Sequence, residues 1–429
     1  MLNFWYRVID FFVPLASLYF CYIIFLNHVL PESILWLGLM VSGLFLFTTQ
    51  LLGGYSKYDN RTIARKLEVV LKGWIFVLLA LVLIAFLVGQ LNSLSRTVFI
   101  VWAFIVPLIV IALKVFINRV FILRINKPFQ WLLVGEKYEF NHFEQMALSK
   151  QKIVTVHICH NDIGVLNQFV KENSVTGIVL NVKEPASNEL VRVLTRFDLE
   201  GISLYSMNHF FESFLRKSFI PYDLIGVDYL DNVRRLSGSQ YFLKRFIDTS
   251  VSSTLLLITL PVMAYSVYKI KRESPGSIFF KQSRVGQDAK CFEVIKFRSM
   301  HENSHFNPYT QENDSRVFPY GEFMRKSRVD ELPQLWSVLK GDMHLCGPRT
   351  EWDILVDNYE KEIPFYHERH LIKPGITGWA QVMYPYGANT EDARQKLMYD
   401  LYYIKNWSIW LEMEVLIRTV MVVLGKRGV

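Results

Sequence analysis

The chain has 429 residues, enough for two or three domains, and 51% of them are hydrophobic and 15% aromatic. This apolar content is high for a soluble protein, and the net charge of +8 fits a chain that lies against anionic lipid and handles phosphates, with no nucleic-acid partner expected. The four cysteines show no CxxC spacing, which argues against both a zinc site and a disulfide framework.

Four apolar blocks fill the first 120 residues, at about 8–30, 33–53, 68–90 and 97–117, and each is long enough to cross a bilayer core. The first block is too long for a signal peptide and lacks a small-residue cleavage site. Two of the connecting segments are strongly positive; they carry Lys57, Arg61, Arg65 and Lys66, and Lys114, Arg119, Arg124 and Lys127. Because positive loops stay in the cytoplasm, we expect both ends of a transmembrane domain at 1–127 to face it.

Residues 128–217 alternate between short apolar runs and amphipathic stretches. The pattern predicts strands at 130–135, 152–159, 176–182 and 202–206, and helices at 137–149, 161–173, 187–199 and 208–217. This alternation indicates a small parallel sheet in a Rossmann-like α/β module. A dinucleotide site would need GxGxxG after the first strand, but the turn reads Gly135-Glu136-Lys137-Tyr138. We therefore expect a structural or regulatory module here.

A linker is predicted at 218–240, followed by a membrane segment at 241–272. Positive residues lie on both sides of its apolar core, so each end prefers the cytoplasm; they are Lys244, Arg245, Lys269, Lys271 and Arg272. Pro261 removes a helix hydrogen bond near the middle, and six Ser/Thr residues at 249–259 can satisfy the freed backbone groups. We predict a re-entrant helix that enters one leaflet, breaks at Pro261 and returns. The alternative is a fifth transmembrane helix, which would place the rest of the chain outside the cell.

The remaining residues, 273–429, contain the candidate chemistry and end in a stretch typical of an interfacial amphipathic helix. Two strand-like runs, FFKQSRVG and CFEVIKFRSM, carry four cations that can converge on phosphate oxygens: Lys281, Arg284, Lys296 and Arg298. Taken alone, such cations are also typical of a solvated surface.

Two adjacent acids, Asp330 and Glu331, lie between clustered cations and a Gly-Pro-Arg turn that ends at Arg349. One interpretation is a capping box, in which Ser327 and Asp330 start a helix. The other is catalytic: one carboxylate attacks phosphorus and its neighbour holds Mg²⁺. The capping box accounts for Asp330 but not for Glu331 and Arg325.

The order of motifs over residues 241–424 resembles the bacterial sugar transferase family, the polyprenyl-phosphate phosphoglycosyl transferases. The shared motifs are SPG (274–276), KFRSM (296–300), DELPQL (330–335), KGDM (340–343), GPR (347–349) and KPGITGWAQV (373–382). The N-terminal helices and the α/β module resemble the long, polytopic branch of that family. The expected fold class is thus membrane α plus α/β: four transmembrane helices, a Rossmann-like module, a re-entrant helix and a small cytoplasmic α/β catalytic domain with interfacial helices.

The resemblance implies transfer of a sugar 1-phosphate from a UDP-sugar to undecaprenyl phosphate with release of UMP. This would be the first membrane step of exopolysaccharide or other surface glycan synthesis, on the cytoplasmic face of the bacterial inner membrane. It implies that Asp330 is the nucleophile, that Glu331 binds Mg²⁺ and that Arg325 contacts phosphate. Asp400 is a further substrate-contact candidate, with helix capping as the alternative.

The sequence departs from the family where many members carry Asn-Gly-Arg after GWAQV. This chain has Met383-Tyr384-Pro385-Tyr386-Gly387, so the role of that arginine cannot be transferred. Two other functions stay open: a non-catalytic membrane scaffold for polysaccharide assembly, and a metal phosphodiesterase that hydrolyses lipid diphosphates. The sequence does not name the sugar, and the oligomeric state is open, a homodimer included.

Overall fold

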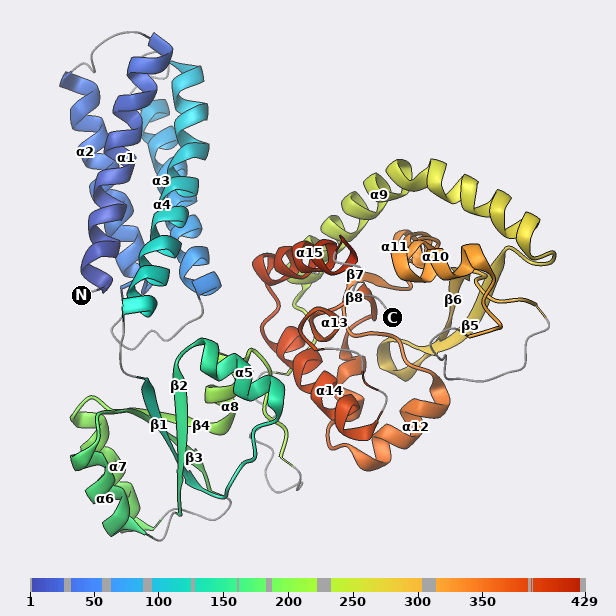
Figure 1. Ribbon diagram of the computed structural model, residues 1–429. Helices are drawn as coiled ribbons and strands as arrows, with labels where there is room; N and C mark the ends of the chain where they lie inside the picture. Colours follow the sequence, from blue (N-terminus) through green and yellow to red (C-terminus); the bar gives the residue numbers. More distant parts are fainter. Residues whose placement is uncertain are drawn as a thin grey trace. The chain divides into compact units, whose positions relative to one another are not determined.

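The computed structural model describes residues 2–26, 32–55, 63–87, 95–124, 128–159, 162–182, 187–221, 233–302, 314–384, 387 and 389–424. The chain divides into two compact units, Met1–Leu215 and Arg216–Val429 (Figure 1).

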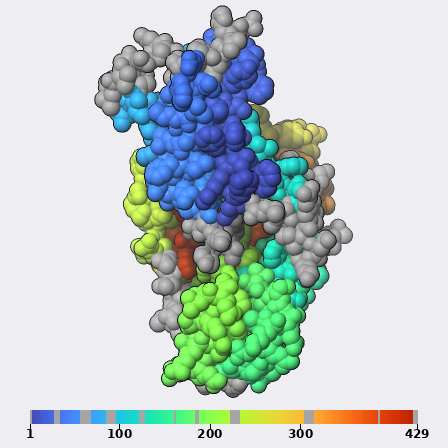
Figure 2. All heavy atoms as spheres, turned by 90° about the vertical axis from the view of Figure 1, so that its left-hand side faces the viewer, coloured from blue at the N-terminus to red at the C-terminus, as the bar shows by residue number. Residues whose placement is uncertain are grey.

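Four apolar helices open the first unit, as predicted: α1 (Leu2–Leu26), α2 (Glu32–Leu51), α3 (Ile63–Leu87) and α4 (Arg96–Arg124). They pack around buried aromatic rings, with Trp74 edge-on to both Phe45 and Trp102. The outer surface of the bundle, blue in Figure 2, exposes large apolar side chains such as Phe12 and Leu79. By length and composition α1, α2 and α4 can cross a membrane, and exposed apolar surface on this scale is typical of contact with lipid.

Lys114, a charge used to orient the bundle, is buried inside it. Lys114 lies inside α4, which continues to Arg124, and its Nζ atom is buried 2.6 Å from a carboxylate oxygen of Asp10 on α1. The two opposite charges neutralise each other inside the bundle, so Lys114 does not indicate which end of the bundle faces the cytoplasm. Lys57, Arg61 and Lys127 lie outside the described residues.

The α/β module confirms the predicted parallel sheet. Its elements are β1 (Phe129–Gly135), α5 (His142–Lys150), β2 (Ile153–Ile158), α6 (Ile163–Glu172), β3 (Val175–Asn181), α7 (Asn188–Leu199), β4 (Ser203–Ser206), α8 (Met207–Phe210) and the π-helical turn η1 (Phe211–Leu215). The strand order is β2-β1-β3-β4, and every pair is parallel. Because side chains alternate across a strand, Leu132 and Val134 of β1 face the core with α6 and α7, while Trp131 packs against Phe210 and Phe214.

The second unit is mainly helical. It comprises α9 (Gly238–Glu273), β5 (Phe279–Val285), η3 (Gln287–Ala289), β6 (Cys291–Phe297), α10 (Pro319–Ser327), η4 (Val329–Glu331), α11 (Gln334–Lys340), β7 (His344–Cys346), α12 (Asp353–Glu362), η5 (Tyr366–Leu371), β8 (Gly375–Thr377), α13 (Trp379–Met383), α14 (Thr390–Lys405) and α15 (Ile409–Leu424). β5 and β6, the two predicted strand-like runs, pair as an antiparallel hairpin, and β7 pairs in parallel with β8. The expected linker begins at Ser218, whose backbone N–H donates to the Met398 carbonyl of α14, and the preceding Lys217 donates to Gln395 on the same helix. Residues 222–232 lie outside the described part.

Helix α9 is continuous, whereas the sequence predicted a break at Pro261. It runs for 36 residues with Pro261 inside it, and Figure 1 shows it as a bent arch over α10 and α11. Proline therefore bends this helix without ending it. The hydroxyls of Thr249, Thr254 and Thr259 donate to carbonyls of Arg245, Ser250 and Leu255. The carbonyl that Pro261 frees is a different one, four residues before it at Leu257.

Both ends of α9 hold the elements that carry the acids. Near its start, Arg245 donates to the carbonyls of Val338 and Leu339 at the end of α11. At its end, Glu273 accepts from the backbone N–H of Tyr320 at the start of α10. The middle of α9 is instead exposed and apolar; Leu257 is 73% exposed.

A group of fully buried charges, the anchor network, joins α9 to α15 and β7. It consists of Lys244, Asp248, His344 and Glu412. Lys244 Nζ lies 2.7 Å from Glu412 and 3.6 Å from Asp248, and Asp248 accepts from the backbone of Leu345 and contacts His344. Lys244 is therefore not the exposed flanking charge that the topology argument assumed. Glu412 lies inside the protein, so it does not lie on the polar face of an interfacial helix.

Candidate active site

Asp330 and Glu331 lie on η4, a single 3₁₀ turn between α10 and α11. Arg328, with φ of 59°, ends α10 in the left-handed conformation and redirects the chain into that turn. Ser327 is the last residue of α10, and its hydroxyl donates to the Phe323 carbonyl. The capping-box interpretation is therefore wrong, because Ser327 ends a helix and does not begin one.

Apolar packing on both sides fixes the turn. Before it, Met324 is buried against Phe297 of β6 and Ile270 of α9, with Val329 beside them. After it, a second cluster holds α11; its buried members are Val294, Leu335, Val338, Met343 and Leu345. Both clusters include residues of β6, so the hairpin and the two acids are held at a fixed distance. Such packing keeps reactive groups in one geometry.

The carboxylate of Glu331 lies among three cations. Its Oε1 atom is 2.8 Å from Lys296 Nζ, 3.7 Å from Arg349 Nη2 and 3.8 Å from Arg328 Nη1. Burial acts to raise the pKa of Glu331, but these cations outweigh it and lower the pKa to about 2. Glu331 is therefore ionised at any physiological pH.

Asp330 has a different environment although it is the next residue. Burial and the neighbouring charge of Glu331 raise the pKa of Asp330 to about 6, against the opposing effect of Lys296, Arg328 and Arg325. Its Oδ1 atom is buried and has no hydrogen-bond partner among the described residues. A buried carboxylate oxygen without a partner is costly and is typical of a reactive or ligand-binding group.

The β5–β6 hairpin separates the predicted cations onto two faces. Lys296 lies opposite Phe280 and Arg284 opposite Phe292, which places both cations on the same face of the hairpin. Lys281 lies opposite Ile295 on the other face, where it forms an exposed ion pair with Glu293. The structure therefore brings Lys296 to the acids but does not bring Lys281 there.

Arg284 lies close to the Gly-Pro-Arg turn. Its guanidinium is 3.5 Å from the Thr350 carbonyl and stacks over the ring of Trp352 at 5.3 Å. Burial lowers the pKa of Arg284 to about 10. The charges of Arg349 and Glu331 both act on the pKa of Arg284, so the three side chains lie in one neighbourhood.

Arg298 supports a turn and is only 5% exposed. It donates to the carbonyls of Ser274 and Ser277 and to the Ser274 hydroxyl, and so holds the Ser-Pro-Gly turn that follows α9. In the structure its hydrogen bonds go to this turn, away from the acid pair.

Asp400 is buried inside α14 and does not cap a helix. Its carboxylate accepts from Arg369 at 2.8 Å, and the same guanidinium donates to the Arg349 carbonyl at 3.0 Å. Burial raises the pKa of Asp400 to about 6 against the opposing charge of Arg369. Arg369 thus connects Asp400 to the site, because it donates both to the Asp400 carboxylate and to the Arg349 carbonyl.

Sequence reasoning missed Arg328 and Arg369. Arg328 could have been found from its i,i+3 spacing to Glu331, which a helical turn brings together. Nothing in the sequence around Arg369 indicates that it supports Arg349, because the contact depends on the tertiary fold. Trp379 of the KPGITGWAQV motif is fully buried, and the guanidinium groups of Arg216 and Arg418 lie over its ring at 4.4 and 5.5 Å.

The acid pair offers the donors that Mg²⁺ prefers, which are carboxylate oxygens. Glu331 contributes an ionised carboxylate to this turn, and its nearest cation contacts involve Oε1. The unpartnered Oδ1 of Asp330 is a second oxygen in the same turn. The residues present therefore fit a Mg²⁺ ion held together with substrate phosphates.

Comparison with known proteins gives two family matches. A family model described as bacterial sugar transferase matches residues 239–426, which contain every residue of the site described above. A second model, described as a CoA-binding domain, matches residues 50–128. The second match covers α3 and α4 and ends where the α/β module begins.

Curated relatives match part of the chain. A UDP-N-acetylgalactosamine-undecaprenyl-phosphate N-acetylgalactosaminephosphotransferase of Aeromonas hydrophila is 44% identical over 189 residues, 44% of this chain and 45% of the relative. A UDP-glucose:undecaprenyl-phosphate glucose-1-phosphate transferase of Xanthomonas campestris is 32% identical over 63% of this chain and 57% of its own length. One of Caulobacter vibrioides is 38% identical over 41% of this chain and 68% of its own length. The chain therefore matches about half the length of the first two relatives.

Proposed function

Because the chain belongs to the bacterial sugar transferase family, we propose that it transfers a sugar 1-phosphate from a UDP-sugar to undecaprenyl phosphate. The products are undecaprenyl-diphosphate-sugar and UMP, and the product begins a surface glycan such as an exopolysaccharide. The observation that carries the proposal is the buried, unpartnered oxygen of Asp330 beside an ionised Glu331 and its cations.

The reaction proceeds in two steps. Asp330 attacks the phosphorus that bears the sugar, the bond from that phosphorus to the UMP oxygen breaks, and an aspartyl phosphosugar forms. A phosphate oxygen of undecaprenyl phosphate then attacks the same phosphorus and releases the Asp330 carboxylate. Because UMP leaves before undecaprenyl phosphate reacts, the soluble nucleotide and the lipid use the same site one after the other.

The cations stabilise negative charge on the transferring phosphoryl group. Lys296, Arg328 and Arg349 already lie within 3.8 Å of Glu331, and Arg325 acts on the charge of Asp330. Glu331 would hold Mg²⁺, which would supply charge neutralisation at the diphosphate and its leaving oxygen.

We also propose that α9 is re-entrant and that the catalytic unit lies on the cytoplasmic face of the inner membrane. A straight helix of 36 residues would span about 54 Å, well beyond a bilayer core of about 30 Å. The start of α9 contacts the end of α11 and its end contacts the start of α10, and these two helices are joined by η4. The exposed apolar middle enters the lipid while both ends stay with the site.

Topology can be tested with native Cys291, which is exposed on β6. With Cys159 replaced by serine, a membrane-impermeant maleimide should label Cys291 only in inside-out vesicles. Labelling in intact spheroplasts would show that α9 crosses the membrane.

The reaction is tested with the full chain in nanodiscs that contain undecaprenyl phosphate. Mg²⁺ and a panel of UDP-sugars are supplied, and UMP and the lipid-linked sugar are measured. We expect one or a few donors to give both products in equal amounts. A scaffold would give neither product, and a phosphodiesterase would consume undecaprenyl-diphosphate-sugar in water without UMP.

A further inference from the structure

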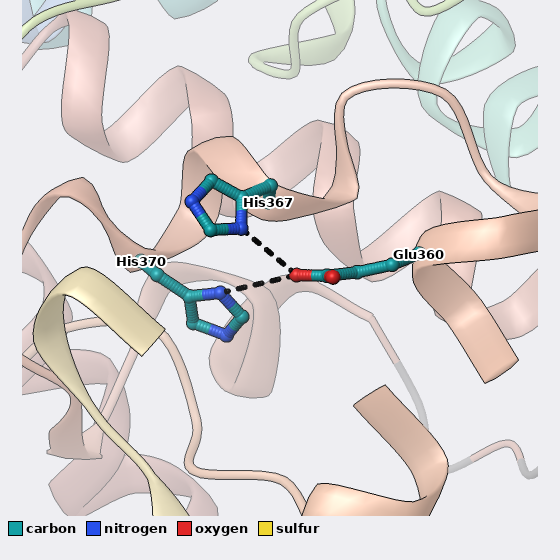
Figure 3. A group of neighbouring side chains, drawn as sticks. All are labelled: Glu360, His367 and His370. Atoms are coloured by element: carbon teal, nitrogen blue, oxygen red, sulfur yellow. Dashed lines mark hydrogen bonds and ion pairs between the residues drawn. The ribbon is translucent and has the colours of Figure 1, made fainter. Parts of the chain in front are cut away.

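A second group of metal-ligating side chains lies in the same unit, outside the acid pair. Glu360 comes from α12, and His367 and His370 come from η5 (Figure 3). One ligand atom from each lies within 4.8 Å of the other two. Nδ1 of His367 and Nδ1 of His370 are 2.9 and 3.8 Å from the same carboxylate oxygen, Oε1 of Glu360.

The local fold explains why the three converge. η5 is a 3₁₀ helix, and three residues per turn place residues i and i+3 on one face. The rings of His367 and His370 are accordingly neighbours, with centroids 5.7 Å apart. Phe365, with φ of 61°, turns the chain between α12 and η5, and Figure 3 shows both rings pointing at Glu360.

His370 is the second observation that points to a ligand. Its side chain is more than nine-tenths buried, and its Nδ1 atom has no hydrogen-bond partner among the described residues. A neutral ring protonated on Nε2 presents a lone pair on Nδ1 toward Glu360.

We propose that Glu360, His367 and His370 bind a divalent transition-metal ion, with Zn²⁺ as the expected occupant. Two imidazole nitrogens and one carboxylate oxygen suit Zn²⁺ better than Mg²⁺ or Ca²⁺, which prefer oxygen donors. Three protein ligands leave one position of a tetrahedral ion for water. The site is thus chemically distinct from the all-oxygen acid pair.

The distances fit with a small adjustment. Ligand bonds of about 2.0–2.2 Å place neighbouring donors of a tetrahedral zinc ion roughly 3.3 Å apart. The two contacts to Glu360, at 2.9 and 3.8 Å, lie on either side of that value. The ion would replace the direct His367–Glu360 contact and draw His370 toward the carboxylate.

Such an ion would link α12 to η5, the segment that contacts the Arg349 carbonyl. η5 also carries Arg369, which donates to the Arg349 carbonyl and to Asp400. Binding should therefore stabilise the folded unit, since a ligand that binds only the folded state raises its stability.

The site can be measured without an activity assay. The full chain is purified in detergent with a histidine-free tag, stripped with a chelator and kept in excess Mg²⁺. Titration with Co²⁺ should give visible d–d absorption that saturates at one equivalent and disappears when Zn²⁺ is added. Zn²⁺ should also raise the Tm of the wild type.

Two variants and two controls locate the binding. His367→Ala, at a largely exposed side chain, and Glu360→Gln should weaken Co²⁺ binding at least about 10-fold, the loss that even an outer-sphere partner causes. Glu368→Gln, which removes an equal charge from η5 beside His367, and Asp330→Asn should bind like the wild type. Absence of saturable binding in the wild type, or unchanged binding in His367→Ala, would overturn the proposal and leave the transferase assignment untouched.

Discussion

The catalytic unit contains two groups of buried charge that are built differently. In the anchor network every ion has a partner inside the protein, since Lys244 contacts both Glu412 and Asp248, and all its side chains are 3% exposed or less. In the acid-pair cluster, made of Asp330, Glu331, Lys296, Arg328 and Arg349, cations outnumber acids. Lys296, Arg328 and Arg349 are 24%, 37% and 40% exposed, and one oxygen of Asp330 has no partner among the described residues.

This difference separates a structural charge group from a functional one. A buried group in which every ion has a partner inside the protein holds helices in register and needs no ligand. A partly open group in which cations outnumber acids is complete only when an anion reaches it, and we propose that a UDP-sugar supplies that anion. The comparison predicts that changes in the acid-pair cluster affect turnover and that changes in the anchor network affect folding.

The largest effect is expected for Asp330→Asn. Loss of the nucleophile should lower UMP release at least about 1,000-fold, because the amide cannot form the acyl phosphate. The Tm should stay the same or rise, since burial already disfavours the ionised carboxylate. Retention of more than a tenth of the activity would contradict the assignment.

For Glu412→Gln we expect a large loss of stability and little loss of activity. The change removes the carboxylate nearest to buried Lys244 and leaves only the longer contact to Asp248, so it should lower the free energy of unfolding by about 3–5 kcal/mol. The fraction that stays folded should turn over at nearly the wild-type rate. The matched control is Glu293→Gln, which breaks the exposed pair with Lys281 and should cost about 1 kcal/mol or less.

The pH profile is a third test of the same contrast. The ionised form of Asp330 is the reactive one, and its raised pKa of about 6 means that kcat/KM rises as the pH increases through 6. Below that value the slope should be about tenfold per pH unit, because Glu331 stays ionised and adds no second transition. Lys296→Met removes a cation that favours ionised Asp330, so it should move the midpoint upward. A flat profile between pH 5 and 7 would exclude Asp330 as the titrating nucleophile.

The smallest effect is expected at the hairpin. Lys296→Ala should lower turnover at least about 10-fold because its ammonium contacts Glu331 and faces the developing charge. Lys281→Ala should change both turnover and Tm very little, since its only described partner is the exposed Glu293. Equal losses in the two variants would show that both faces of the hairpin meet the substrate.

Local patterns in the sequence predicted the elements well. The four apolar blocks, the β–α alternation at 128–215 and the two strands of the hairpin all appear where expected, because hydrophobic period and length determine them. The adjacency of Asp330 and Glu331 to several cations was also readable. The sequence pattern did not show which residue each charged side chain pairs with.

The errors have one physical origin. Lys114, Lys244 and Glu412 looked like surface charges in the sequence, yet each is buried against an ion far away in the chain. Lys281 and Lys296 looked equivalent, but the hairpin register places them on opposite faces. Long-range pairing and register are tertiary properties, so a single sequence does not determine them.

The central claim is that Asp330 becomes covalently linked to the phosphosugar. The full chain is given a UDP-sugar labelled in the phosphate next to the sugar, with Mg²⁺ and without undecaprenyl phosphate. We predict about one equivalent of UMP per folded protein, label on the peptide that contains Asp330, and transfer of that label to lipid when undecaprenyl phosphate is added. Release of UMP only when the acceptor is present, with no label on the wild-type protein, would contradict the covalent mechanism.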